Sequence, residues 1–162
     1  MAFHYTALLL PIRVLQALFA IIVLGVLAYA SNDWAWDWSP SEINFLIFVS
    51  VWTLLAVAYL VIAPSRFPTA AHKYGILAAE AVTMIFWFAG FVALAVFLNN
   101  AQCGARSGRS WGPCRAAIAG DVFAAFTWLL FVATTIMAAL AALDGGRSKD
   151  GNGVMHSQAV GV

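Results

Sequence analysis

The chain has 162 residues, of which 64% are apolar and 9% charged, and its formal net charge is +1. Soluble domains carry about 25% charged residues, so this chain has too few to cover so large an apolar interior with a water-facing shell. The composition excludes an ordinary soluble domain and indicates a membrane protein, and its scattered Lys and Arg residues exclude the clustered basic surface that nucleic-acid binding needs.

Four apolar runs are long enough to cross a bilayer, because a hydrocarbon core of about 30 Å needs roughly 20 helical residues. They lie at Leu8–Ala30, Ile43–Ala63, Tyr74–Leu98 and Ala117–Leu143. Each is predicted to be a helix, since backbone groups in lipid must be satisfied within their own segment. The runs lack the alternation of membrane barrel strands. We therefore expect an all-α integral membrane four-helix bundle that forms one domain, residues 1–143.

The connections between the runs are short and polar. Pro64 and Pro68 in the second connection suit helix stops. The third connection, residues 99–116, is rich in Gly and Arg and holds both cysteines of the chain. Residues 144–162 have little to bury, so they are predicted to be a disordered cytoplasmic tail.

The orientation in the membrane is predicted from Lys and Arg in the short loops. Five of these residues fall on one side and three on the other: Arg13, Arg66, Lys73, Arg147 and Lys149 against Arg106, Arg109 and Arg115. The excess favours a cytoplasmic position for the first side, which also holds both termini.

Cys103 and Cys114 fall in the same polar stretch, which suits a disulfide on the oxidising side of a membrane. A metal site is less favoured because no His or further Cys lies near them, and a redox pair would more often be Cys-x-x-Cys. A disulfide on the second side agrees with cytoplasmic termini. The two arguments are independent of each other.

A cleaved signal peptide is an alternative for the first run, because Ala28-Tyr29-Ala30 before Ser31 resembles a signal-peptidase site. The apolar stretch is long for a signal core, and Arg13 and Gln16 interrupt it. Cleavage would leave three spans, and the cysteines would face the same side.

Charged and amide side chains inside the spans need a partner or a purpose, because a charge near the bilayer core costs at least a few kcal/mol. Arg13 lies roughly 8 Å and Glu80 roughly 10 Å from the cytoplasmic end of their helices. Because the depths match, we expect Arg13 and Glu80 to pair across the first and third helices, with Gln16 adding a hydrogen bond. The functional alternative makes Glu80 a proton or cation site. Asp121 is expected near the outer interface, close to one of the loop arginines.

Small residues recur at four-residue spacing in the last span, a pattern that lets helices approach closely in lipid. Packing within the monomer is the simpler interpretation, and a face for self-association is the other. The stripe comprises Ala116, Gly120 and Ala124, then Thr134, Ala138 and Ala142.

Sites of catalysis and cofactor binding are not indicated by the sequence. The three histidines are separated and form no metal-ligand group. We see no phosphate-binding loop, nucleophile elbow or paired-carboxylate site. We therefore expect no cofactor, no metal and no enzymatic activity, and an enzyme is the weakest of three function classes.

Several stretches together resemble a MARVEL-domain protein of the compact type common in fungi. They are Arg13–Gln16, Phe86–Ala95, Cys103 with Cys114, Arg115–Gly120 and Phe126–Leu130. The resemblance extends from about Arg13 to Leu143. It implies an M-shaped four-helix bundle with cytoplasmic ends, and roles in membrane apposition, vesicle cargo sorting or lateral domains, often in sterol- or sphingolipid-rich membrane.

These observations predict a non-enzymatic membrane organiser of the plasma membrane or of secretory-pathway or vesicle membranes. Its expected partners are membrane lipids, other membrane proteins and, if the stripe is a contact face, a second copy. No nucleic acid is expected. The alternative is a small ion or proton channel or transporter that uses Glu80.

Overall fold

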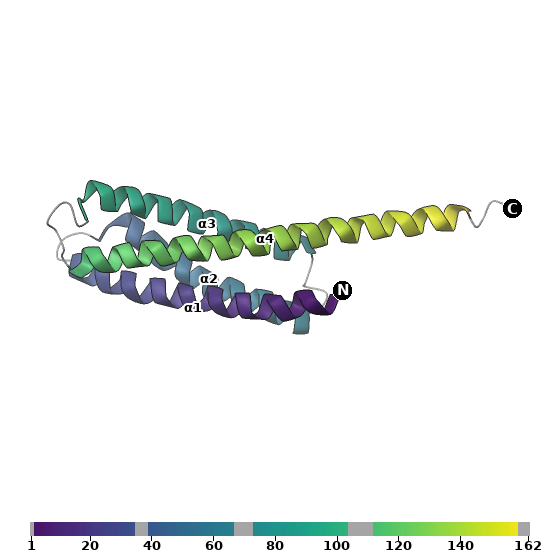
Figure 1. Cartoon of the computed structure of the whole chain (residues 1–162), viewed down its shortest axis with the longest axis horizontal. Coiled ribbons are helices and arrows are strands. Elements are labelled where there is room, and N and C mark those ends of the chain that lie inside the picture. Colours follow the sequence, from purple (N-terminus) through teal and green to yellow (C-terminus); the bar gives the residue numbers. More distant parts are fainter. Residues whose placement is uncertain (1, 35–38, 67–72, 104–111, 159–162) are drawn as a thin grey trace.

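The computed structural model describes residues 2–34, 39–66, 73–103 and 112–158. Four helices make up nearly all of this part of the chain, and successive helices run in opposite directions (Figure 1). Their bounds are α1 Ala2–Trp34, α2 Ser41–Arg66, α3 Lys73–Asn100 and α4 Gly112–Gln158.

Each helix contains a stretch that is long and apolar enough to cross a membrane. These stretches are Leu9–Asn32, Ser41–Ile62, Gly75–Asn100 and Gly112–Ala141. They confirm the predicted all-α architecture with four spans, and they agree with the four apolar runs to within a few residues at most ends. Because the number of spans is even, both ends of the bundle domain lie on the same side of the membrane.

Several helix boundaries differ from expectation, and α1 already begins at Ala2, six residues before the predicted run. The second helix continues past Pro64 to Arg66, so this proline does not end the helix where we expected. Transmembrane helices tolerate proline because neighbouring groups satisfy the freed carbonyl, and Pro11 likewise lies inside α1. The fourth helix begins at Gly112, more than one turn before the predicted start, with Pro113 in its first turn.

The fourth helix also extends to Gln158, past the predicted end of the last span at Leu143. Figure 1 shows this extension projecting beyond the other three helices. A transmembrane helix needs only about 20 residues, so the extension is not required for crossing the bilayer. Disorder of residues 144–162 stays a prediction.

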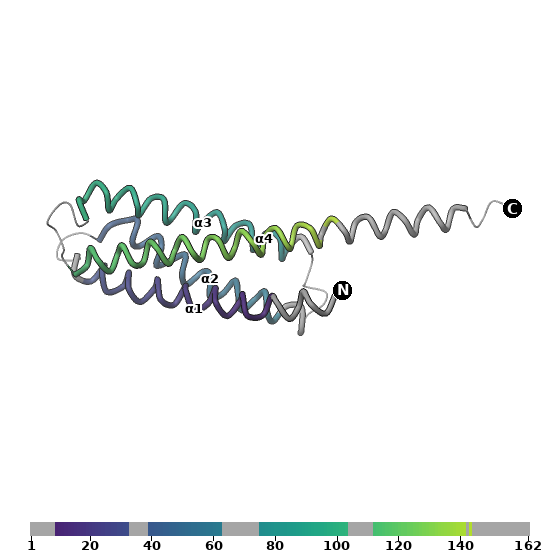
Figure 2. The backbone as a smooth tube through the Cα atoms, in the orientation of Figure 1, coloured from purple at the N-terminus to yellow at the C-terminus, as the bar shows by residue number. Residues whose placement is uncertain are grey.

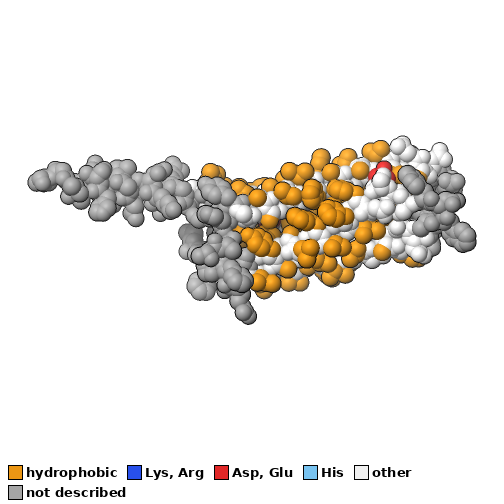
Figure 3. Space-filling view, turned by 180° about the vertical axis from the view of Figure 1, so that it is seen from behind, with side chains coloured by type: hydrophobic (Ala, Val, Ile, Leu, Met, Phe, Trp, Pro, Cys, Tyr) orange, Lys and Arg blue, Asp and Glu red, His pale blue; other side chains and the backbone are white. Residues whose placement is uncertain are grey.

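The four helices form a closed ring in which each contacts its two neighbours: α1 packs on α2 and α4, and α3 packs on α2 and α4. The tube in Figure 2 follows this arrangement. The centre holds apolar side chains from all four helices, the largest being Trp87 and Phe131. Outside, hydrophobic side chains cover the middle of the bundle as a broad band on the face in Figure 3, as expected for a surface in lipid.

Two glycines allow the closest approaches between helices. A Cβ atom at Gly90 of α3 would lie 2.5 Å from Leu46 Cδ2 of α2, and one at Gly120 of α4 would lie 2.7 Å from Leu27 Cδ2 of α1. Real Cβ atoms do not come this near. The absence of a side chain at Gly90 and Gly120 therefore sets the spacing of two of the four helix pairs.

The end of α3 is closed by a turn that places Cys103. Gln102 adopts a left-handed backbone with φ of 55°, the amide of Cys103 donates to Leu98 O at 2.9 Å, and the amide of Gln102 donates to Asn99 O at 3.1 Å. This is the Schellman pattern of a helix C-terminus. It brings Cys103 within 5.5 Å of Cys114, Cα to Cα, and the two cysteines form a disulfide at what we call the disulfide end of the bundle.

Reduction of this disulfide is expected to lower the free energy of unfolding by about 3 kcal/mol, because the bond removes loop-closure entropy from the unfolded chain. The measurement is the unfolding midpoint in detergent, with and without a membrane-permeant phosphine, for the wild type and for Cys103→Ser/Cys114→Ser. The double variant should match the reduced wild type and should not respond to the phosphine. An unchanged midpoint on reduction would contradict the expectation.

Candidate functional site

The most polar place inside the bundle is a closed ring of four side chains, which we call the polar ring. Arg13 Nη1 donates to Gln16 Oε1 at 2.9 Å, and Arg13 Nη2 forms an ion pair with Glu80 Oε1. Gln16 Nε2 donates to Thr134 Oγ1 at 3.2 Å, and Thr134 Oγ1 donates to Glu80 Oε2 at 2.7 Å. The ring therefore joins α1, α3 and α4.

The polar ring is shielded from its surroundings. Gln16 and Glu80 are 0% exposed, Thr134 is 1% exposed and Arg13 is 9% exposed. A charge taken into such a place is costly unless it is paired and its remaining polar atoms are bonded. In the polar ring, one carboxylate oxygen of Glu80 accepts from the guanidinium of Arg13, and the other accepts from the hydroxyl of Thr134. The two charges balance, so the ring is neutral as a whole.

The hydrogen bonds of the polar ring are also consistent in direction. Thr134 Oγ1 accepts a hydrogen bond from the side-chain amide of Gln16. The hydroxyl of Thr134 has one proton and two acceptors within reach, Glu80 Oε2 at 2.7 Å and Phe131 O at 3.2 Å. We assign the proton to Glu80 because that contact is the shorter one. A carboxylate at residue 80 is an acceptor only, and an arginine is a donor only. Each neighbouring pair is therefore a donor facing an acceptor.

Three of these residues are predicted from the sequence to meet, and the structure brings Arg13, Gln16 and Glu80 together. The fourth is not recognised from the sequence as a hydrogen-bonding residue, because Thr134 is assigned there only to the stripe of small residues. The sequence nevertheless contains a feature that could have predicted its role, because Thr134 carries a hydroxyl at a depth similar to that of Glu80 on another span.

A second set of hydrogen bonds links α2 and α3. Trp87 Nε1 donates to Thr53 Oγ1 at 2.9 Å, and Trp52 Nε1 donates to Thr83 Oγ1 at 3.1 Å. Each threonine in turn donates to the carbonyl four residues before it on its own helix, at 2.8 Å for Thr53 and 2.7 Å for Thr83. Both hydroxyls thus accept from an indole and donate to the backbone. From the sequence alone, the position of Trp52 and Trp87 deep in their spans predicts packing or contact with lipid and does not predict these hydrogen bonds.

Replacing Trp87 with phenylalanine is expected to lower the free energy of unfolding by about 1–3 kcal/mol, because it removes the only N–H donor of a fully buried side chain and leaves a gap beside Thr53. The measurement is the unfolding midpoint in detergent. Trp128→Phe is the matched control, since Trp128 is only partly buried and contacts the rings of Phe88 and Phe91. Equal shifts in the two variants would count against the indole–hydroxyl bond.

The residues of the small-residue stripe differ in burial. Gly120 and Ala124 are buried, and Gly120 faces Leu27 of α1. Ala138 is partly exposed. The side chain of Ala142 lies outside the described residues. The part that contacts another helix does so within the monomer, and self-association through the rest of the stripe stays a proposal.

Asp121 lies on α4 at the disulfide end, one residue after Gly120. Its Oδ1 is buried and has no hydrogen-bond partner among the described residues. Arg115, one of the three arginines expected near it, is exposed and forms no ion pair with it in the described part of the chain. The other two, Arg106 and Arg109, lie outside the described residues.

Metal-binding groups are not brought together in the described part of the chain, where no cluster of three or more His, Cys, Asp or Glu side chains occurs. Both cysteines are used in the disulfide. The polar ring is able to hold α1, α3 and α4 in a fixed register.

A closed bundle of four apolar helices, with Arg13 and Glu80 paired inside it, defines a multi-pass integral membrane protein. The family comparison then names the domain: the MARVEL family, described as a membrane-associating domain, matches residues 6–137, and the chain belongs to this family. This confirms the resemblance found in the sequence. No curated protein and no solved structure matches the chain.

Proposed function

We propose that this chain is a non-enzymatic organiser of membranes, acting in lateral domain formation, membrane apposition or vesicle traffic. The family supports a membrane-associating role in general. The more specific roles are our proposal, as are the cytoplasmic position of the termini and a location in the plasma membrane or in a secretory-pathway or vesicle membrane.

The observation that carries the proposal is the polar ring. Arg13 and Glu80 are bonded to each other and to Gln16 and Thr134, so their charges serve to hold α1, α3 and α4 together. Over the spans the outer surface is mainly apolar, and large exposed apolar side chains occur on every helix, such as Leu55 at 65% and Ile85 at 56% exposure. A rigid body with this surface interacts with its surroundings through lipid contact and helix packing.

The proposed partners are membrane lipids, including sterol- and sphingolipid-rich mixtures, and the helices of other membrane proteins. A second copy is a further proposed partner. In each case binding would occur on the outside of the bundle, where membrane helices associate by close packing rather than by a hydrophobic effect.

The test is the distribution of the full chain with a fluorescent C-terminal tag, expressed at native level. An organiser should concentrate in patches or vesicles, and its fluorescence should recover slowly after bleaching. The tagged chain should also partition unevenly in giant vesicles whose lipids separate into two phases. A uniform distribution in both settings would contradict the proposal.

The transport alternative is tested by ion and proton flux in sealed liposomes. An organiser should give no flux above that of empty liposomes. Flux that is lost in Glu80→Gln and kept in Glu42→Gln, a carboxylate variant at the disulfide end, would overturn the proposal in favour of a transporter.

A further inference from the structure

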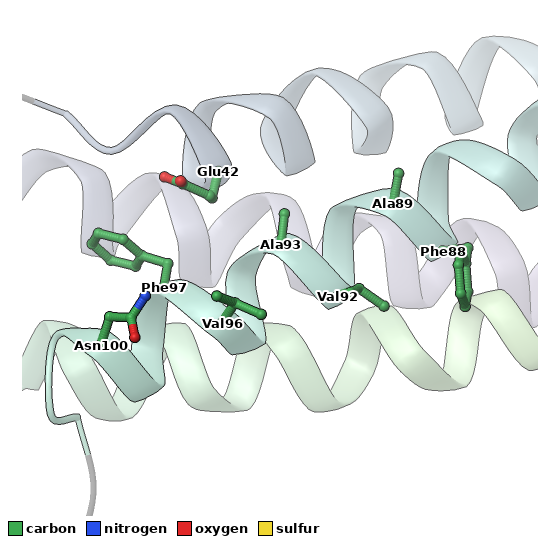
Figure 4. A pocket seen from close by; sticks show the side chains of 8 residues that line it. All are labelled: Glu42, Phe88, Ala89, Val92, Ala93, Val96, Phe97 and Asn100. Carbon is green, nitrogen blue, oxygen red and sulfur yellow. The ribbon is translucent and has the colours of Figure 1, made fainter.

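A groove on the outside of the bundle runs along α3 toward the disulfide end, with a volume of about 500 Å³. Figure 4 shows its lining, with Glu42 reaching toward it from the start of α2. We call it the α3 groove, and its main lining residues are Phe88, Ala89, Ala93, Phe97, Asn100 and Glu42.

The shape of the α3 groove follows from side-chain size. Ala89 and Ala93 are one turn apart and leave a shallow floor, while Phe88 and Phe97 rise at its two ends. Asn100 lies twelve positions after Phe88, which corresponds to about 18 Å along a helix. This is close to one leaflet of hydrocarbon, since the full core measures about 30 Å.

The chemistry changes along the groove. Its walls are apolar over most of the length, and its polar side chains, Glu42 and Asn100, lie at the disulfide end, where the span ends. The groove therefore has an apolar part inside the bilayer and a negatively charged, hydrogen-bond-accepting part at the surface. This division matches a lipid with one chain along α3 and a head whose outer end is a positively charged group.

The size of the groove also favours a lipid chain over a helix. Its volume falls within the range of about 300–1,000 Å³ for small-molecule sites. A helix about 10 Å wide and 18 Å long would occupy roughly 1,400 Å³, nearly three times the space. Since the groove opens to the membrane, lipid is always present at high concentration to fill it.

We propose that the α3 groove binds one acyl chain of a phospholipid whose head ends in a primary ammonium, with the ammonium bonded to Glu42 and Asn100. The carboxylate of Glu42 supplies the complementary charge, and an N–H donor suits both oxygens. A choline head carries the same charge without an N–H. Sterol and a second copy of the chain are the competing occupants.

Glu42 also stabilises the start of α2, and the experiment has to separate this role from the proposed binding of the lipid head. It lies in the first turn of α2, where a negative charge favours the helix, and it accepts from Ser41 Oγ at 3.2 Å. That role affects stability, whereas the proposed one affects which lipid is retained. The inference goes beyond the proposed organising function, because lipid retention is measured on isolated protein and does not depend on patches or vesicles.

The experiment is native mass spectrometry of the full chain in detergent, with ethanolamine and choline phospholipids of identical acyl chains. The wild type should retain the ethanolamine lipid about fivefold more than the choline lipid, the effect of one partly exposed charged contact. Glu42→Gln should make retention of the two lipids equal. Asn100→Ala, at an exposed position, should reduce the preference independently.

The apolar part is tested by filling the groove. Ala93→Phe should reduce retention of both lipids, while Ala95→Phe, an equal change at an exposed position of the same helix outside the lining, should not. The unfolding midpoint of each variant shows that folding is kept.

Five results would overturn the proposal, four of them in lipid retention and one in oligomeric state. Two concern the head group: the wild type retains the ethanolamine and choline lipids equally, or Glu42→Gln keeps the full preference for the ethanolamine lipid. A third is equal lipid retention by Ala93→Phe and Ala95→Phe. A fourth is displacement of the phospholipid by sterol in both the wild type and Glu42→Gln. A change in the dimer fraction with Ala93→Phe at unchanged lipid retention would assign the groove to a second copy, which also overturns it.

Discussion

Glu80→Gln is expected to lower the free energy of unfolding by about 3–5 kcal/mol, among the largest effects of any single change in this chain. The substitution keeps the size of the side chain and removes its charge. Arg13 would then be a buried cation without an anion, held only by the oxygens of Gln16 and the new amide. The measurement is unfolding of the purified chain in mixed micelles, followed by helical circular dichroism.

The pairing is tested by a double-variant cycle. Arg13→Gln should be about as harmful as Glu80→Gln, because it leaves a buried anion, and the double variant should lose much less than the sum of the two. Glu42→Gln is the control for removing a carboxylate that lies at the surface. If Glu80→Gln and Arg13→Gln each unfold like the wild type, the ion pair does not stabilise the bundle.

Gly120→Val is expected to lower the free energy of unfolding by about 1–3 kcal/mol or more, because α1 and α4 would have to separate. Even a single Cβ atom at this position would lie 2.7 Å from Leu27 Cδ2, 3.0 Å from Leu27 Cγ and 3.2 Å from Val26 Cγ2. Leu27 is completely buried, so its side chain has little room to turn away. The unfolding midpoint in detergent is again the measurement.

Gly25→Val is the matched control for the glycine change. Gly25 lies on α1, two residues before Leu27, and nothing lies within 4 Å of the position of its missing Cβ atom. The same substitution there should leave the midpoint nearly unchanged. Similar losses at both glycines would mean that valine disturbs the helices themselves rather than the contact between α1 and α4.

The number, type and approximate limits of the helices can be predicted from the sequence, because length and apolarity alone decide whether a segment crosses lipid. The depth of a residue can be predicted as well, since it follows from counting residues along a helix. For this reason the sequence alone places Arg13 and Glu80 at matching levels. The end of α4 cannot be predicted in the same way, since lipid sets no upper limit on the length of a helix.

The rotation of each helix about its axis is harder to predict. In a soluble helix the polar face marks the outside, but these spans are apolar on all sides, so the sequence hardly distinguishes inward from outward positions. The hydrogen bonds of Trp52 and Trp87 to threonines depend on this rotation, as does the role of Thr134. The α3 groove escapes prediction for the same reason, since it also requires Glu42 to arrive from a different helix.

The polar ring has a consequence for how the chain is made. Arg13 and Glu80 are 67 residues apart, and Gln16 and Thr134 are 118 apart. At roughly 5–20 residues per second, a ribosome needs about 3–13 seconds to add Glu80 after Arg13 has been synthesised. During that interval the first helix carries an uncompensated cation, so the nascent chain should stay close to the insertion machinery until the third helix arrives, and chains truncated before α3 should be rapidly degraded.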